Sequence, residues 1–236
     1  MTLSDKQTVA NFLDISKDYL CGGYKSERKE YSFDTPNVSI ENPLKNDTLE
    51  CIANEINSCK NCQLGQTRKN SVPGEGVKNP LVMVIGEGPG ADEDTQGRPF
   101  VGKAGQLLDK MLSAINLSRT ENCFIANMVK CRPPNNRDPY PDEREACSGF
   151  LNRQILILKP KIILVVGSIA SQTLLNSTDS VAKMRGKFFE YKIENLTIPL
   201  LVTYHPSFLL RSEDFKRPTW EDLKLLRTKI DELTKM

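Results

Sequence analysis

Two short runs of consecutive apolar residues constrain the fold of this chain more than any other feature. Residues 81–85 read Leu-Val-Met-Val-Ile between a proline and a glycine, and residues 162–166 read Ile-Ile-Leu-Val-Val. Both runs have the length of a strand and are apolar on both faces, which is typical of a parallel strand buried between two layers. Such a strand needs helices on both sides of its sheet.

Helical and strand patterns alternate along the rest of the chain. Helices are predicted over residues 49–56, 102–117, 141–158 and 168–175, strands over 123–129, 188–193 and 198–203, and a charged helix after Pro218. This alternation predicts an α/β fold, a three-layer α/β/α sandwich around a mainly parallel central sheet.

The first 48 residues differ in charge from the rest. Residues 1–50 carry 6 Lys and Arg against 9 Asp and Glu, a net charge of −3, which leaves +5 on residues 51–236. A short helix is predicted over 3–20 and a polar, proline-containing linker over 25–45. We therefore expect an N-terminal extension over 1–48, whose role the sequence does not reveal, and one α/β domain over 49–236.

The expected cellular compartment follows from two features of the sequence, the N-terminus and the length of the apolar runs. No basic segment precedes an apolar stretch at the N-terminus, and the apolar runs are too short to cross a membrane. We expect a monomer in the reducing cytoplasm, with no membrane contact. The seven cysteines are then better interpreted as metal ligands and buried thiols than as disulfides.

Charge and histidine content exclude two further classes. The formal net charge is only +2, so this is not a polybasic nucleic-acid binder, and any nucleic-acid contact must come from a local patch. A single histidine excludes a multi-histidine metal site.

A glycine-rich segment follows the first apolar run. Residues 86–91, Gly-Glu-Gly-Pro-Gly-Ala, match the dinucleotide-binding pattern G-x-G-x-x-A, which requires a helix to begin at the glycines. Here Asp92, Glu93 and Asp94 follow, and a long acidic loop is predicted in place of that helix. The three carboxylates would also repel a pyrophosphate. Phe100, further along, either packs in the core or offers an aromatic face to a planar ligand.

The cysteine spacing indicates a metal site. Cys59 and Cys62 form a C-x-x-C pair, and Cys131 and Cys147 follow at long, irregular intervals. Zinc sites usually bring two short-spaced pairs, and four irregularly spaced thiolates suit an iron–sulfur cluster at least as well. Cys123 falls in a predicted strand and is expected to be a buried thiol.

Two polar residues are expected at the edge of the sheet where Glu87 lies. Asn127 ends a predicted strand, and its amide can donate and accept side by side as a nucleobase edge requires, or it can complete a local turn. His205 follows the last predicted strand and is either structural or catalytic. The wedge candidates Leu209 and Leu210 lie next to Arg211, a combination found where side chains enter a base stack.

Together these segments resemble the family-4, iron–sulfur uracil-DNA glycosylases. The matching pieces are residues 86–105, residues 127–137, the four cysteines and residues 205–211, and the resemblance covers about residues 49–234. It implies hydrolysis of the N-glycosidic bond of deoxyuridine in DNA, which releases uracil and leaves an abasic site.

The resemblance also implies a role for each matching residue. Gly88 would contact the uracil, Phe100 stack on it, Asn127 bind its edge, Glu93 exclude a thymine methyl group, and His205 stabilise the charge on the uracil oxygen. Cys59, Cys62, Cys131 and Cys147 would hold a structural [4Fe-4S] cluster. Single- or double-stranded DNA that contains uracil would be contacted by Lys130, Arg132, Arg137, Ser207 and Arg211, with Leu209 or Leu210 filling the vacated stack.

The group that activates water is the least determined part of the site. In the best-known branch of the superfamily an Asp stands where this chain has Gly88, so Glu87 is our first candidate, ahead of Glu93. A covalent uracil-trapping relative uses a histidine in an inserted basic loop near the third motif, and this chain has no histidine there. The remaining alternative is a non-catalytic iron–sulfur DNA-binding or replication-associated factor, which would need neither Asn127 nor His205.

Overall fold

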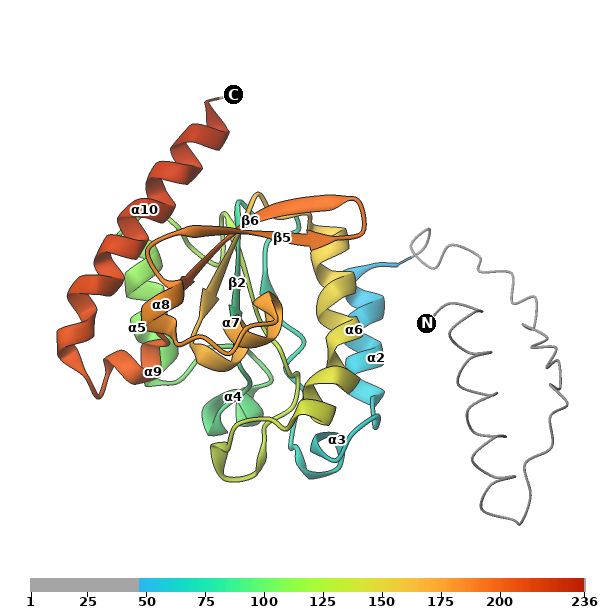
Figure 1. The fold of residues 1–236 in the computed structure, drawn as a ribbon. Coiled ribbons are helices and arrows are strands. Elements are labelled where there is room, and N and C mark those ends of the chain that lie inside the picture. Colours follow the sequence, from blue (N-terminus) through green and yellow to red (C-terminus); the bar gives the residue numbers. More distant parts are fainter. Residues whose placement is uncertain (1–46, 236) are drawn as a thin grey trace, which may run out of the picture. The chain divides into compact units, whose positions relative to one another are not determined.

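A six-stranded sheet forms the centre of the computed structural model, which describes residues 47–235 (Figure 1). The strand order is β1-β3-β2-β4-β6-β5, with the four inner strands parallel and both edge strands antiparallel to their neighbours. The strands are β1 (Glu75–Gly76), β2 (Val82–Gly86), β3 (Cys123–Asn127), β4 (Ile162–Val166), β5 (Phe188–Ile193) and β6 (Leu196–Thr203).

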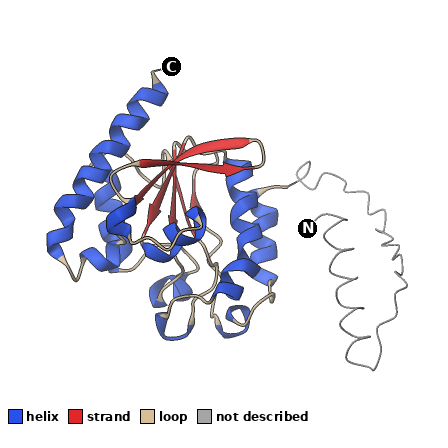
Figure 2. Ribbon diagram, viewed as in Figure 1, coloured by secondary structure: helices blue, strands red, loops and turns tan. Residues whose placement is uncertain are grey.

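Helices cover both faces of this sheet (Figure 2). They are α2 (Leu49–Ser58), α3 (Leu64–Thr67), α4 (Ala91–Gln96), α5 (Lys103–Ser113), α6 (Pro141–Leu158), α7 (Ser168–Leu175), α8 (Val181–Met184), α9 (Pro206–Leu209) and α10 (Lys216–Thr234), with short 3-10 turns η2 (Pro134–Asn136) and η3 (Glu213–Phe215). Helices α5 and α10 contribute to the core on one face, and α6, α7 and α8 to the core on the other. The predicted three-layer sandwich with a mainly parallel sheet is confirmed.

The inner strands are apolar on both faces because each face meets a helical layer. In β2, Val82 and Val84 join the core under α5 and α10, whereas Met83 and Ile85 join the core under α6. All five residues of β2 and all five of β4 are buried. The alternation of side chains along a strand therefore divides one apolar run between two cores.

The strand order creates a switch point at β2. Strand β3 pairs with one side of β2 and β4 with the other. After β2 the chain therefore first adds a strand on one side and then crosses over to add the next strand on the other side. In open α/β sheets, ligands bind at the carboxyl ends of the strands beside such a point. In Figure 1 the arrowheads of the parallel strands point toward this end, where α4 and α7 lie.

Several predicted boundaries differ from the structure. A helix, α4, begins at Ala91 directly after the glycines, so the prediction of a long acidic loop was wrong. Acidic residues at the start of a helix are stabilised by its dipole, and Asp92, Glu93 and Asp94 all lie in the first turn of α4. Helix α5 ends four residues early, at Ser113, and α10 begins at Lys216, two residues before Pro218.

The expected extension lies outside the described residues, except for its last two. Asp47 accepts two hydrogen bonds from Arg153 of α6, each 2.7 Å long, and the Thr48 side chain caps α2. Within residues 47–235, no helix is both long enough and apolar enough to cross a membrane.

Candidate active site

A cavity of about 720 Å³ opens at the carboxyl ends of the parallel strands. We call it the main cavity. Its walls come from the segments that follow β2, β3, β4 and β6. It brings together nine of the residues expected from the sequence, namely Glu87, Gly88, Glu93, Phe100, Asn127, Arg137, His205, Ser207 and Arg211.

Asn127 presents an unsatisfied polar atom to the main cavity. The residue is 2% exposed, and its Oδ1 has no hydrogen-bond partner among the described residues. A Cβ atom on the neighbouring Gly86 would come within 2.5 Å of this oxygen and 2.6 Å of the Phe100 ring. Because buried polar atoms are nearly always paired in native proteins, this oxygen is available to accept a hydrogen bond from a molecule in the cavity.

Phe100 lies in the main cavity and in the core at the same time. Its backbone has a φ of 52°, a left-handed conformation that is costly for a bulky residue. Its carbonyl accepts a hydrogen bond of 2.9 Å from Nη2 of Arg119. The ring centroid lies 5.6 Å from that of His205. The ring is therefore buried in the core, as one interpretation expected, and it also lines the cavity.

Glu93 fixes the backbone on both sides of α4. One carboxylate oxygen accepts from the backbone N–H of Gly90 (3.0 Å), and the other from Val101 (2.8 Å) and Gly102 (3.1 Å). Three backbone donors on one carboxylate tie the glycine segment to the segment that carries Phe100. Glu93 thus organises the wall of the cavity as well as lining it.

His205 is neutral at pH 7 and its tautomer is defined. The backbone N–H of Ser207 donates to Nδ1 (3.1 Å), and the Ser207 hydroxyl lies 2.8 Å from the same nitrogen. Nδ1 is therefore the acceptor, and the proton of the neutral ring is on Nε2. Burial, assisted by Arg211 and opposed by Glu93, lowers the pKa of His205 to about 4.

Glu87 is the carboxyl group of the main cavity with the most altered acidity. Burial and then the nearby Asp138 raise the pKa of Glu87 to about 7, against the opposing charge of Arg144. A carboxyl that titrates near neutral pH is suited to general-base work. At the next residue, a Cβ on Gly88 would lie 2.8 Å from Cγ2 of Val129, so this position is closely packed.

Two expected DNA contacts are wrong. Lys130 is 1% exposed, and its ammonium donates to the backbone oxygen of Asn127 (2.9 Å) and to Oε1 of Gln154 (2.7 Å), so it cannot reach a phosphate. Leu209 is 1% exposed and belongs to the core, because it packs with the α5 and α10 layer. Leu210, in contrast, is 45% exposed and stays available as a wedge.

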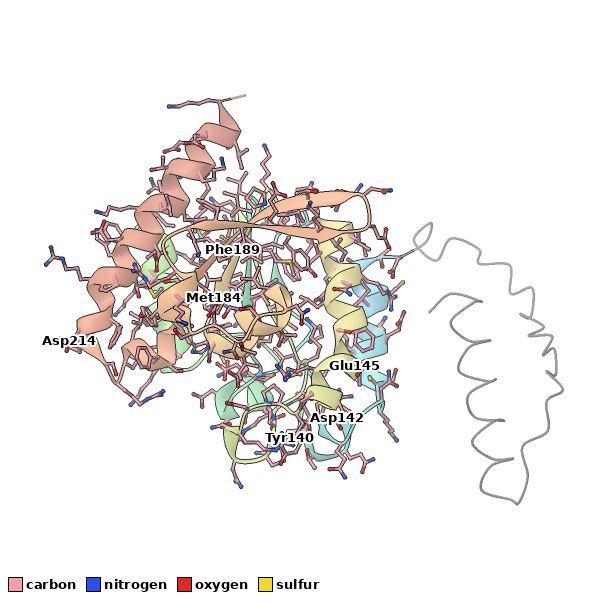
Figure 3. The ribbon with its side chains drawn as sticks, viewed as in Figure 1. Tyr140, Asp142, Glu145, Met184, Phe189 and Asp214 are labelled. Atoms are coloured by element: carbon pink, nitrogen blue, oxygen red, sulfur yellow. The ribbon has the colours of Figure 1, made fainter. Side chains whose placement is uncertain are left out.

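Two other cations expected to contact DNA, Arg137 and Arg132, differ in the contacts they make within the protein. The Arg137 guanidinium pairs with both oxygens of Glu143 (2.8 and 2.6 Å) and lies 3.7 Å from the centre of the Tyr140 ring. Figure 3 shows Tyr140 at the end of the molecule that carries α4. Arg132 is half-buried and does not line the main cavity itself, but its Nε donates to Oδ1 of Asn136 (2.8 Å), which does.

The four expected cysteine ligands gather around a second, small cavity. Cys59, Cys62, Cys131 and Cys147 all line it, although Cys131 and Cys147 come from segments far from the first pair. Nη1 of Arg68 lies 2.9 Å from Sγ of Cys131, and the backbone N–H of Lys130 lies 3.3 Å from Sγ of Cys147. Burial raises the pKa of Cys131 and raises that of Cys147 to about 11, and the donors from Arg68 and Lys130 oppose this. Four cysteines around one cavity, with donors aimed at two of the sulfurs, fit a metal group bound through thiolates.

The four side chains do not converge as ligands of a single ion. Within residues 47–235, no three His, Cys, Asp or Glu side chains are arranged to bind one metal ion. Of the other described cysteines, Cys51 is exposed and Cys123 is buried as expected, with its pKa raised to about 12 by burial. Cys21 lies outside the described residues.

The sequence interpretation missed several residues of the site. Arg119 and Arg68, which hold Phe100 and Cys131, carry no local signal because their partners are distant in the chain. Tyr204 and Phe208 also line the main cavity, and their position on either side of His205 in the sequence was an available signal.

Comparison with known proteins shows which family this chain belongs to. The model of the Uracil DNA glycosylase superfamily matches residues 73–224. The chain is 44% identical over 185 residues to a type-4 uracil-DNA glycosylase of Sulfurisphaera tokodaii, and the aligned region covers 77% of this chain and 84% of that protein. It is 39% identical over 183 residues to the type-4 uracil-DNA glycosylase of Thermotoga maritima, covering 76% and 93% of the two chains. The chain therefore belongs to the uracil DNA glycosylase superfamily.

Proposed function

We propose that this protein is a DNA repair glycosylase that hydrolyses the N-glycosidic bond of deoxyuridine in DNA, releasing uracil and leaving an abasic site. The observation that carries the proposal is the unpaired Oδ1 of Asn127 in a cavity shared with Phe100 and His205. An amide that shares a cavity with an aromatic ring and a neutral imidazole matches a planar base with donors and acceptors on its edge. The names of the similar type-4 proteins support the same activity.

Recognition begins with a base outside the helix. The target carbon cannot be reached within a duplex, so the nucleotide must be flipped at a cost of a few kcal/mol. Phe100 offers a ring for stacking, and Oδ1 of Asn127 can accept the hydrogen of the uracil N3. Both groups are held in advance, Phe100 by Arg119 and Asn127 by its burial, so little is reorganised on binding.

Bond breakage develops positive charge on the sugar and negative charge on the uracil. Catalysis is then mainly electrostatic, through donors placed where the charge develops. The Nε2–H of a neutral His205 donates a hydrogen bond to the uracil oxygen without transferring a proton. In its ionised form Glu87 positions water and stabilises the sugar cation, and Glu93 helps to exclude a thymine methyl group.

We further propose that the four cysteines hold a [4Fe-4S] cluster. Each thiolate of such a cluster would bind a different iron atom, and the support for this proposal is that all four cysteines line one cavity. When bound, the cluster cross-links the segment after α2 to the start of α6 and the loop after β3. Metal analysis of purified protein tests this, and stoichiometric zinc without iron would contradict it.

Contacts with the DNA beyond the flipped base complete the proposal. Arg132, Arg137, Ser207 and Arg211 meet DNA, and Leu210 fills the space left by the flipped base. Residues 49–236 form the glycosylase domain and 1–48 an extension. The protein acts as a monomer in the cytoplasm, where thiols stay reduced.

A single-uracil oligonucleotide tests the activity. The protein is incubated with this strand, and alkali then cleaves any abasic site. Cleavage at the uracil, and none in a matched thymine strand, is expected. Binding of the uracil strand without cleavage, by protein with its metal site intact, would instead support the non-catalytic alternative, which the similar proteins do not favour.

A further inference from the structure

The main cavity has much more room than a single pyrimidine requires. Its volume of about 720 Å³ lies within the range of sites for drug-sized ligands, about 300–1,000 Å³. Asn127 and Phe100 account for one part of the lining. Another part consists of Tyr204, Phe208 and Phe215, which we call the aromatic wall.

The three rings of the aromatic wall form one block. The ring centroids lie 5.4 Å apart for Tyr204 and Phe208, 5.0 Å for Tyr204 and Phe215, and 4.9 Å for Phe208 and Phe215. Tyr204 and Phe208 pack against the core, whereas Phe215 is 36% exposed. Their mutual contacts hold the rings in place, so a ligand that stacks on the exposed ring needs little ordering of the protein.

The charge beside the aromatic wall favours an anionic ligand. Arg211 lines the same cavity, is exposed, and forms no ion pair within the described part of the chain. The nearby Glu213 is paired with Lys216 at 2.6 Å. Asp214 lies at the outer end of α10, near its start (Figure 3). An aromatic surface beside an uncommitted guanidinium is the combination that binds the bases and backbone of single-stranded nucleic acid.

We propose that the aromatic wall is a second nucleobase subsite, which takes the unpaired base next to the flipped deoxyuridine on the same strand. The inference rests on the proposed function, because the uracil held by Asn127 and Phe100 anchors the strand in the cavity. The neighbouring nucleotide is one phosphate away, with Arg211 available for that phosphate. Stacking on an aromatic ring tolerates every base, so this subsite imposes no sequence preference.

The proposal has a consequence for substrate choice. A neighbouring base can reach the aromatic wall only when it leaves its own pair and stack. Uracil in single strands or in unpaired bubbles is therefore preferred over uracil in a fully paired duplex. The preference comes from Phe215 and not from the uracil subsite.

The test uses single strands that contain 2′-fluoro-2′-deoxyuridine, a substrate analogue that resists hydrolysis. One strand carries the fluorescent base 2-aminopurine on the 5′ side of the analogue, another on the 3′ side, and a third has abasic sites on both sides. The variants are Phe215→Ala and Phe215→Trp. Trp220→Ala is the matched control, because Trp220 is 40% exposed on α10 and does not line the cavity.

Stacking in the wild-type protein is expected to quench the 2-aminopurine on one side of the analogue. Phe215→Ala should abolish the quenching and weaken binding on the order of 10-fold. Phe215→Trp should retain both properties, and Trp220→Ala should behave as wild type. On the strand with abasic neighbours, wild type and Phe215→Ala should bind equally.

Two results with the Phe215→Ala variant would overturn the inference. They are quenching that survives in Phe215→Ala, and an equal loss of binding on the strand with abasic neighbours, which would make Phe215 part of the uracil subsite. Thermal melting shows whether each variant is folded. If the wild type neither excises uracil nor binds the analogue, the proposed function itself fails, whereas normal excision with unquenched 2-aminopurine refutes the second subsite alone.

Discussion

The ammonium group of Lys130 donates a hydrogen bond of 2.9 Å to the backbone oxygen of Asn127. The same ammonium bonds Gln154 at 2.7 Å, and the backbone N–H of Lys130 faces Sγ of Cys147 at 3.3 Å. One buried residue therefore connects the proposed base-recognition residue to the cysteine cavity, through its side chain on one side and its backbone N–H on the other. A change at the cysteine cavity is therefore expected to affect Asn127, and a change at Asn127 to affect the cysteine cavity.

Replacement of Lys130 by methionine should weaken the fold and the activity together. The backbone oxygen of Asn127 and Oε1 of Gln154 would lose a buried donor, and each loss costs about 1–3 kcal/mol. We expect a lower free energy of unfolding in urea and a lower kcat. The dependence of DNA binding on salt should stay unchanged, because Lys130 makes no phosphate contact. A flatter salt dependence would restore the phosphate role that the burial of Lys130 excludes.

Replacement of Arg211 by alanine should change the salt dependence of DNA binding and leave the stability of the fold nearly unchanged, the reverse of what is expected for Lys130. Arg211 is exposed on the rim of the main cavity, so stability should be nearly unaffected. Each phosphate contact contributes about 0.7 to the slope of log binding constant against log salt on a single strand. The slope should therefore fall by about that amount. Fluorescence titrations at several salt concentrations measure it, and an unchanged slope would remove Arg211 from the DNA interface.

His205 should make the stability of the protein depend on pH on the acid side of neutral. Its pKa falls from 6.5 in the unfolded chain to about 4 in the folded protein. Between these values the unfolded chain binds more protons, so stability falls as pH decreases from 6.5 to 4. His205→Gln removes this contribution. The difference between wild type and variant in urea unfolding should change from pH 7 to pH 4.5, and a constant difference would contradict the lowered pKa.

Glu87 should control the rise of activity with pH. Its pKa is raised to about 7, so the carboxylate form increases as pH rises through neutral. We expect the single-turnover rate of uracil excision to rise over this range. Glu87→Gln should lower the rate by about 10- to 100-fold and flatten the profile, at the lower end of general-base effects because an oxocarbenium ion needs little help from the nucleophile. An unchanged profile in Glu87→Gln would assign the titration to another group.

The cysteines allow a matched pair of variants. Cys59→Ser removes one of the four thiols of the small cavity, whereas Cys51→Ser changes an exposed thiol of α2 outside it. Iron content and thermal stability should fall in Cys59→Ser, because bound metal stabilises the folded state. Both should be unchanged in Cys51→Ser. Equal iron content in the two variants would exclude Cys59 as a ligand.

The layered fold was predictable because its signals are local. The apolar runs at 81–85 and 162–166, and the helices at 141–158 and 168–175, appear in the structure with boundaries that match or nearly match. Helix α4 was missed, since its stability depends on the carboxylate of Glu93, which accepts from the N–H groups of Gly90, Val101 and Gly102. Two of these donors come later in the chain, and their approach is a tertiary event.

The contrast between Leu209 and Leu210 has the same origin. Both are wedge candidates in the sequence, but consecutive residues of a helical turn point in different directions. The core takes Leu209 and leaves Leu210 45% exposed. Lys130 likewise reads as a surface cation beside other basic residues, and only the packed loop after β3 places it in the interior.

By itself, the sequence determined the order of strands and helices, the types of residue at the sheet edge and the resemblance to a family. These depend on periodicity and on motifs that are continuous in the chain. Only the tertiary structure decided which side chains are buried and what each one faces. It left Oδ1 of Asn127 without a hydrogen-bond partner among residues 47–235, made Arg119 donate to the carbonyl of Phe100, and gathered Tyr204, Phe208 and Phe215 into one wall. The reason is physical: burial and hydrogen bonding join residues that are distant in the chain, so no local pattern encodes them.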